Sequence, residues 1–283
     1  MIIAFSGGKG GTGKSTVSTN IAVLLEYFAL VDLDVEAPDD HILLSTELVK
    51  VKDVNLFQPV FNHDACFACG RCLDACHDSA IISGRDGKPI LIPELCGGCR
   101  GCKLICPSEE AIKEGGKFVG RIYENLTPYG FPLITGELLE GEEKTYRVLL
   151  ETRRYAVGKY EKLIFDTAAG AGNSIFKALE GVDVVVAVTE PTPFGVRDLE
   201  KILEVTKRLE RRTVVVINRS GTGDESVVES LCDRYGVKLI GRIPYSENVM
   251  KSYFENRPIV KTDLPEAEVF KELKDRILEE ACK

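Results

Sequence analysis

The chain alternates between short runs of consecutive apolar residues and longer segments in which apolar residues recur every three or four positions. A short apolar run is typical of a buried strand, and the longer spacing is typical of a helix that covers a sheet. Strands are predicted over 2–5, 29–33, 162–166, 182–188, 213–217 and 239–243. A strand and turn is predicted over 131–136, and helices over 145–157, 199–209 and 266–282. We expect an α/β fold with a mostly parallel, doubly wound sheet that has helices on both faces.

One stretch of the chain departs from this alternation because it is rich in cysteine. Its eight cysteines form two runs with the spacing C-x₂-C-x₂-C-x₃-C, and each cysteine of the second run lies 30 residues after its counterpart. This internal duplication matches the two-cluster bacterial ferredoxin pattern. We therefore predict a ferredoxin-like (α+β) domain over 58–118, inserted into a larger domain formed by 1–57 and 119–283.

The cysteine spacing also predicts which thiolates share a cluster, because the fourth cysteine of such a run ligates the other cluster. The first [4Fe–4S] cluster is assigned to Cys66, Cys69, Cys72 and Cys106. The second [4Fe–4S] cluster is assigned to Cys96, Cys99, Cys102 and Cys76. Two zinc sites are the alternative, although zinc sites usually use two cysteine pairs rather than two sets of four.

One histidine and two further cysteines have roles that the sequence leaves open. His77 follows the fourth cysteine of the first run, where ferredoxin sequences usually have proline, and it is either a proton donor near a cluster or an ordinary surface histidine. Cys232 and Cys282 lie outside both runs, and we expect them to be structural or free thiols.

A glycine-rich segment joins the first predicted strand to a segment with helical spacing, and Gly8 to Ser15 fits G-x-x-x-x-G-K-[ST]. Glycines let backbone N–H groups approach phosphate oxygens, and the following helix adds a partial positive charge. Lys14 is expected to reach the β- and γ-phosphates, and the Ser15 hydroxyl to ligate Mg²⁺. The expected phosphate contacts are Gly8, Lys9, Gly10, Gly11, Thr12, Gly13, Lys14, Ser15 and Thr16.

Lys9, which precedes the other residues of the motif, narrows the class of phosphate-binding loop. Lys9 to Ser15 reads K-G-G-T-G-K-S, the deviant Walker A motif, and here the chain resembles the MinD/ParA/Mrp class of P-loop ATPases. Over essentially its whole length the chain resembles those members that carry an inserted ferredoxin domain. The resemblance implies ATP and ADP as ligands, and an ATP-dependent homodimer in which Lys9 reaches the phosphates of the partner. Lys9, Lys14 and Asp34 are the residues to which it assigns catalysis.

Carboxylates at predicted strand ends complete the expected phosphate site. Asp32 and Asp34 end the strand over 29–33, and the carboxyl edge of a parallel sheet is where α/β folds bind ligands. The resemblance implies that this is switch I, with Asp34 orienting the attacking water and Asp32 near Mg²⁺. Asp166 begins D-x-x-x-G, which ends at Gly170 and resembles the Walker B and switch II segment, with Asp166 near Mg²⁺.

The resemblance also implies where the base lies. Asn218 and Arg219 end the predicted strand over 213–217, and in this class the asparagine recognises adenine. Pro244 follows the strand over 239–243 and resembles the loop that packs against the base. The alternative is ordinary turn chemistry at the ends of strands.

Composition narrows the classes of function. The net charge of −8 argues against nucleic acid as a partner, and no apolar run approaches the roughly 20 residues of a membrane span. The predicted helix over 266–282 is acidic, so we expect it to dock on the sheet rather than on a membrane. With no signal peptide visible, we expect a cytoplasmic protein in which cysteine serves metal or redox chemistry.

The combined motifs predict an Mg²⁺-dependent ATPase that couples nucleotide state to electron transfer through iron–sulfur clusters, or to metallocluster metabolism. Its expected partner is a redox or iron–sulfur client protein. One alternative is an iron–sulfur assembly carrier of the Mrp type, and another is a positioning ATPase like MinD or ParA. Cluster reduction without loss would favour the first function, and cluster transfer to an apo-protein would favour the carrier.

Overall fold

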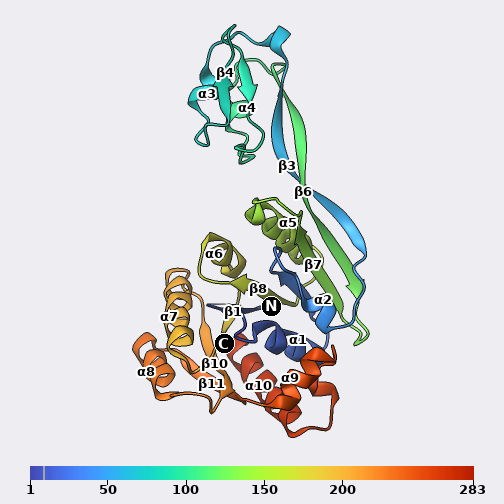
Figure 1. The fold of residues 1–283 in the computed structure, drawn as a ribbon, viewed down its shortest axis with the longest axis vertical. Coiled ribbons are helices and arrows are strands. Elements are labelled where there is room, and N and C mark those ends of the chain that lie inside the picture. The colour runs from blue at the N-terminus through green and yellow to red at the C-terminus, as the bar shows by residue number, and fades with distance from the viewer. Residues whose placement is uncertain (9) are drawn as a thin grey trace.

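The computed structural model describes residues 1–8 and 10–283. Its larger part is a nine-stranded sheet in the order β11-β10-β9-β1-β8-β2-β7-β6-β3. A small lobe formed by residues 62–111 stands away from that sheet at the end of two long strands, β3 (Lys50–Phe61) and β6 (Ile112–Leu126) (Figure 1). The chain thus has one large layered part and one small outlying part.

Seven strands of the large sheet run parallel to one another. They are β1 (Ile2–Gly7), β2 (Ala29–Leu33), β7 (Pro132–Leu138), β8 (Leu163–Ala169), β9 (Val184–Thr189), β10 (Thr213–Ser220) and β11 (Lys238–Pro244). The central strands are buried on both faces, which explains why they read as continuous apolar runs. The prediction of an α/β fold with a mostly parallel sheet is confirmed.

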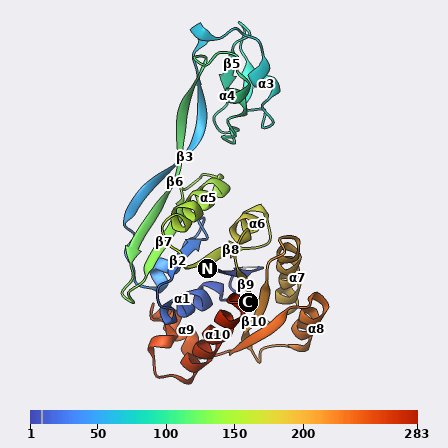
Figure 2. The same ribbon diagram turned by 180° about the vertical axis from the view of Figure 1, so that it is seen from behind.

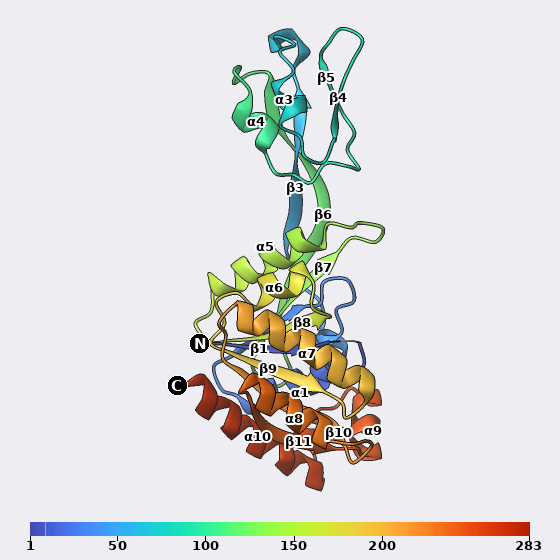
Figure 3. The same cartoon turned by 90° about the vertical axis from the view of Figure 1, so that its left-hand side faces the viewer.

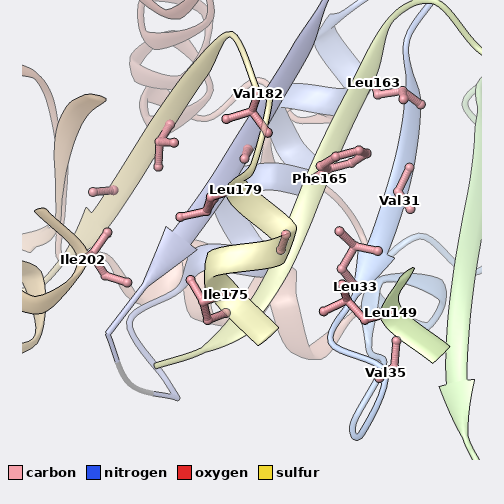
Figure 4. Close-up of a cluster of buried hydrophobic side chains, with 14 of the residues drawn as sticks. Val31, Leu33, Val35, Leu149, Leu163, Phe165, Ile175, Leu179, Val182 and Ile202 are labelled. Carbon is pink, nitrogen blue, oxygen red and sulfur yellow. The ribbon is translucent and has the colours of Figure 1, made fainter. Parts of the chain in front are cut away.

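Helices cover both faces of this sheet. One face carries α1 (Lys14–Leu24), α9 (Glu247–Phe254), η2 (Ile259–Lys261) and α10 (Pro265–Ala281). The other face carries α5 (Thr145–Val157), α6 (Asn173–Leu179), α7 (Pro193–Arg208) and α8 (Ser226–Tyr235). Successive side chains of a strand alternate between the two resulting cores, so Leu163 and Phe165 of β8 face α5 and α6 (Figure 4), while Ile164 belongs to the other core.

The arm that carries the lobe is an antiparallel pair of strands. β3 pairs with β6 along its whole length, and β6 pairs with β7 at the edge of the large sheet. The sequence predicted neither strand, and the predicted boundaries at residues 58 and 118 fall inside them. Figures 1 and 2 show that the two strands continue without a break from the sheet to the lobe.

The lobe contains little regular structure. Its elements are η1 (His63–Ala65), α3 (Arg71–Asp74), β4 (Ile81–Ser83), β5 (Pro89–Leu91) and α4 (Gly101–Ile105), with β4 and β5 forming a separate two-stranded sheet. Gly70 and Arg100 precede the two short helices, and both have left-handed backbone, with φ of 75° and 65°. Since these positions are 30 residues apart, the duplication in the sequence recurs in the backbone.

The last helix packs on the sheet. Phe270, Leu273 and Ile277 of α10 are buried in the same core as Val17 and Ile21 of α1. This docking is the arrangement expected from its acidic outer face. Within residues 1–8 and 10–283, none of the helices has the length and apolar character needed to span a bilayer.

Candidate functional site

A cavity of about 470 Å³ opens at the carboxyl edge of the parallel strands. Strand ends meet there because the strands are parallel, and α/β sheets bind ligands at this edge. Among the residues expected to bind nucleotide, the cavity is lined by Gly10, Gly11, Thr12, Gly13, Lys14, Ser15, Thr16, Asp34, Asn218, Arg219 and Pro244. The expected phosphate and base residues therefore border a single space.

The phosphate loop runs between the end of β1 and the start of α1. Gly11 and Gly13 have φ of 86° and 82°, a left-handed conformation that favours glycine. A Cβ on Gly13 would lie 2.1 Å from Nδ2 of Asn218, and that nitrogen donates a hydrogen bond of 2.8 Å to the Thr12 carbonyl. Gly8 packs closely against Asp198 instead of lining the cavity. Lys9 lies outside the described residues.

Lys14 is held by a buried ion pair. Its Nζ lies 2.7 Å from Oδ1 of Asp166 and 3.3 Å from the Ser15 hydroxyl. Burial opposes the charged ammonium, but the attraction of Asp166 outweighs burial and raises the pKa of Lys14. The lysine is therefore charged and aimed toward the bottom of the cavity, where a phosphate would compete with Asp166 for it.

Asp32 organises the loop that follows β2. Its Oδ1 accepts the backbone N–H of Asp34 at 3.0 Å, and its Oδ2 accepts those of Asp39 and Asp40 at 3.1 and 3.2 Å. The parallel register places Asp32 beside Asp166. Burial raises the pKa of Asp32, and the neighbouring Asp166 raises it further. Asp32 thus shapes the loop from beneath the cavity rather than lining it.

Asp34 lines the cavity and is half-buried. Burial raises its pKa, whereas the Lys14 ammonium lowers it. At the other end of the site, Gly170 donates its backbone N–H to the Gly7 carbonyl at 3.0 Å, so the segment after Asp166 is attached to the phosphate loop. Both segments that the sequence assigned to the switches therefore contact the loop or its cavity.

Two acidic residues of the site were missed in the sequence. Asp39 lines the cavity, and Asp40, at the start of the short helix α2 (Asp40–Leu43), is fully buried with no hydrogen-bond partner on either carboxylate oxygen among the described residues. Their signal was the pair of adjacent carboxylates shortly after a strand end.

The far wall of the cavity is apolar. Beside Asn218, Arg219 and Pro244 it is formed by Tyr245 and by Val249, Met250, Tyr253 and Phe254 of α9. Arg219 is fixed by a 2.7 Å ion pair with Glu190. The sequence did not predict α9, whose side chains gather on this wall although its apolar residues form no long periodic run.

The lobe gathers the cysteines in two sets of four. One small cavity is lined by Cys66, Cys69, Cys72 and Cys106. The other is lined by Cys76, Cys96, Cys99 and Cys102. All ten cysteines of the chain are described and none forms a disulfide. His77 is exposed and lines neither cavity, Cys232 is buried in the large part, and Cys282 is exposed.

The donor set of each small cavity fits a thiolate-ligated cluster. Backbone N–H groups of Ala80 and Gly101 point at the sulfurs of Cys76 and Cys99, at 3.3 and 3.4 Å. Such N–H···S contacts stabilise cluster-bound thiolates. Burial raises the pKa of Cys102 to about 11 and also raises that of Cys72 and Cys96. Metal binding must therefore displace protons from these thiols.

The two candidate sites lie in different parts of the molecule. The lobe stands beyond the β3 and β6 edge of the sheet (Figure 3). The large cavity lies at the carboxyl ends of the parallel strands. Any effect of the large cavity on the cysteine sites of the lobe must therefore pass through the arm or through a partner molecule.

Comparisons with known proteins place these features in context. The family model of the CobQ/CobB/MinD/ParA nucleotide binding domain matches residues 3–259. An uncharacterized protein of Methanocaldococcus jannaschii is 36% identical over 269 residues, covering 92% of each chain. An iron-sulfur cluster carrier protein of the same organism is 25% identical over 301 residues, covering 98% of this chain and 83% of its own. Septum site-determining protein MinD of Pyrococcus horikoshii, solved with Mg-ADP, superposes with a TM-score of 0.60 at 19% identity, covering 98% of this chain and 95% of its own.

Proposed function

We propose that this chain, which belongs to the CobQ/CobB/MinD/ParA nucleotide-binding family, hydrolyses ATP with Mg²⁺ and uses the nucleotide state to control electron transfer through two [4Fe–4S] clusters. One observation carries the proposal. A cavity bordered by a phosphate loop and carboxylates occurs in the same chain as two cavities that are each lined by four unpaired cysteines.

The residues of the large cavity have the chemistry that phosphoryl transfer needs. Loop amides and the Lys14 ammonium bind and neutralise phosphate oxygens, and the Ser15 hydroxyl is available to Mg²⁺. When γ-phosphate binds, Lys14 exchanges Asp166 for phosphate, which frees the Asp166 carboxylate to face Mg²⁺ and its waters. Asp34 orients the attacking water from the side wall. Bound Mg²⁺ supplies charge neutralisation on the phosphates.

A dimer remains part of the proposal. The relative of known structure named above was solved with Mg-ADP, and the matching family model describes a nucleotide binding domain. We infer that ATP brings two copies together so that Lys9 of one copy meets the phosphates bound by the other. A Lys9→Ala variant would then hydrolyse ATP slowly without losing the fold.

The cysteines of the lobe favour retained clusters. Each cavity presents four thiols, and in the cavity lined by Cys76 and Cys99 backbone N–H groups are aimed at both of these sulfurs, as around a resident [4Fe–4S] cluster. When bound, the clusters supply one-electron transfer. The cysteine side chains would hold the clusters as thiolates. Because the Cys102 side chain is buried, access to the cluster that it would ligate is limited.

Contacts between the switch I loop and the arm support coupling. Leu138, at the end of β7, donates its N–H to the Val35 carbonyl at 2.7 Å. From α5, Arg147 donates to the Asn55 carbonyl on β3 at 3.2 Å, and Glu151 pairs with Lys52 at 2.9 Å. A phosphate-driven change in the loop after β2 therefore has a continuous bonded route to the arm. ATP must also favour one of two arrangements for that route to transmit anything.

A carrier function is the second candidate because one relative is named an iron-sulfur cluster carrier protein. Carriers release their clusters, whereas this chain offers two complete sets of four cysteines. Incubating the loaded protein with an apo-ferredoxin separates the two. Retention of iron supports electron transfer, and nucleotide-dependent loss of iron to the acceptor supports the carrier.

Anaerobic purification followed by iron, sulfide and ATPase assays tests the proposal. We expect about eight irons and eight sulfides per chain together with Mg²⁺-dependent ATP hydrolysis. Stoichiometric zinc without sulfide contradicts the cluster assignment. Absence of hydrolysis at every nucleotide and metal concentration contradicts the ATPase assignment.

A further inference from the structure

Carboxylates outnumber cations beneath the large cavity. The Lys14 ammonium pairs with Asp166, and the remaining carboxylates of the group have no such partner among the described residues. The carboxylates of this group are Asp32, Asp34, Asp39, Asp40 and Asp166. Burying excess negative charge is unfavourable unless a proton or a cation neutralises it.

Asp40 is the least satisfied member of the group. Its side chain is 0% exposed, and neither carboxylate oxygen has a hydrogen-bond partner in the described part of the chain. Buried polar groups in folded proteins are nearly always paired, so an unpaired carboxylate indicates an interaction with something else. Its position is fixed, because its backbone N–H donates to Asp32 Oδ2 at 3.2 Å.

Three of these carboxylates converge. One oxygen each from Asp32, Asp39 and Asp40 lies within 4.8 Å of the others. Mg²⁺ and Mn²⁺ prefer oxygen ligands at about 2.0–2.2 Å, and Ca²⁺ takes them at about 2.3–2.6 Å, so oxygens on opposite sides of one ion are roughly 4–5 Å apart. The spacing therefore accommodates a single hard divalent cation.

The trio lies next to the phosphate site. Asp39 and Ser15 line the same large cavity. Asp32 Oδ2 accepts backbone N–H groups from both Asp39 and Asp40, which holds the three carboxylates in place without a ligand. A cation held there would be close to the hydroxyl that is expected to ligate Mg²⁺ on ATP.

We propose that Asp32, Asp39 and Asp40 bind one divalent cation in the absence of nucleotide, so that the chain is loaded with metal before ATP enters. Binding of this cation is independent of hydrolysis, and only its delivery to ATP rests on the proposed function. The loop after β2 would then be ordered by the cation itself, in addition to any contact with γ-phosphate.

Equilibrium dialysis of the nucleotide-free full chain against Mn²⁺ alone tests the site. Manganese is measured separately from iron, and we expect one Mn²⁺ per chain. Asp40→Asn, which keeps the size of the side chain, should weaken Mn²⁺ binding roughly 10- to 100-fold. Asp39→Asn should weaken it as well. Glu36→Gln removes the same charge from an exposed residue of the same loop and should leave Mn²⁺ binding unchanged.

Circular dichroism and ADP binding check that the variants fold. If Asp40→Asn fails to fold, the Mn²⁺ affinity of Asp39→Asn tests the site. The proposal is overturned if the wild-type chain binds no Mn²⁺, or if both aspartate variants bind it as well as wild type. It is also overturned if infrared spectra show a protonated carboxyl that disappears in Asp40→Asn and is insensitive to Mn²⁺. A chain that hydrolyses ATP but binds no Mn²⁺ in the absence of nucleotide overturns this proposal alone, and Mn²⁺ binding without hydrolysis overturns the proposed function alone.

Discussion

The candidate site of the sheet is formed mainly by backbone loops, whereas that of the lobe is formed by side chains. The nucleotide cavity is made of backbone loops at the ends of strands that two large apolar cores hold in place. The lobe has a small core of Phe57, Ile81, Cys102, Ala111 and Ile112, and several cysteines pack against it. One site is therefore shaped by the fold, whereas the other consists of cysteine side chains, and in the proposed function bound metal would add the stability that the small core lacks.

Iron removal should separate the two parts most strongly. A domain with so small a core usually needs metal to fold. Chelation under reducing conditions should strongly reduce hydrogen-exchange protection over 62–111, leaving only what the small core supplies, while protection over β1, β8 and β9 stays. Mass-spectrometric exchange before and after chelation measures this. Equal protection of the lobe with and without iron would show that its own packing suffices.

Lys14→Ala should abolish hydrolysis and weaken nucleotide binding. The change removes the charge that meets the phosphates and leaves the buried Asp166 carboxylate without its 2.7 Å partner. Loss of one such stabilising group typically lowers turnover about 10²–10³-fold or more. Steady-state ATPase and ADP titration measure the two effects. Lys201→Ala, which breaks the more exposed pair with Asp198, is the matched control and should retain both activities.

Asp34→Ala should keep ATP bound and slow turnover by roughly 10²–10⁴-fold, the usual contribution of a group that positions a reacting proton or water. The side chain lines the cavity wall without any ion pair to the loop among the described contacts, so its removal should spare binding. Single-turnover assays with bound ATP separate the two steps. Hydrolysis at the wild-type rate would mean that another group directs the water.

Raising the pH should weaken the metal-free lobe and leave the sheet unaffected. Burial raises the pKa of the Cys102 thiol from 9.0 to about 11 in the folded state. A thiol whose pKa is raised in the folded state contributes its full stability at pH values below its ordinary pKa. This contribution is lost as the pH rises from about 9 to about 11. Hydrogen exchange of apo-protein across this range, corrected for the intrinsic rate, detects the change. A Cys102→Ser variant should show a smaller pH dependence, with the remainder coming from the Cys72 and Cys96 thiols, whose pKa burial also raises.

The sequence predicted the parallel strands well because they are buried on both faces and read as apolar runs. Most of the residues that it assigned to the nucleotide, among them Lys14, Asp34 and Asn218, border one cavity, because parallel pairing brings the ends of the strands together. The two sets of four cysteines gather as their spacing suggested.

The arm escaped prediction for a physical reason. Exposed, half-buried and buried positions are mixed along β3 and β6, so no continuous apolar run marks these strands, and Gly115 and Gly116 interrupt the strand pattern. Asp40 was overlooked because it is buried although its sequence context is typical of an exposed residue. Its burial depends on tertiary packing, and a carboxylate in an acidic loop reads as a surface residue.

The measurement that tests the central claim most directly is the reduction potential of the clusters in each nucleotide state. Spectroelectrochemical titration would be run on the anaerobic full chain with ADP, with a non-hydrolysable ATP analogue, and on Lys9→Ala with the same analogue. The account predicts that the analogue shifts the potential or the chelator accessibility of the clusters relative to ADP, and that Lys9→Ala removes the shift. Identical potentials and accessibility in all three samples would contradict it and leave an ATPase and a cluster-binding lobe that merely share a chain.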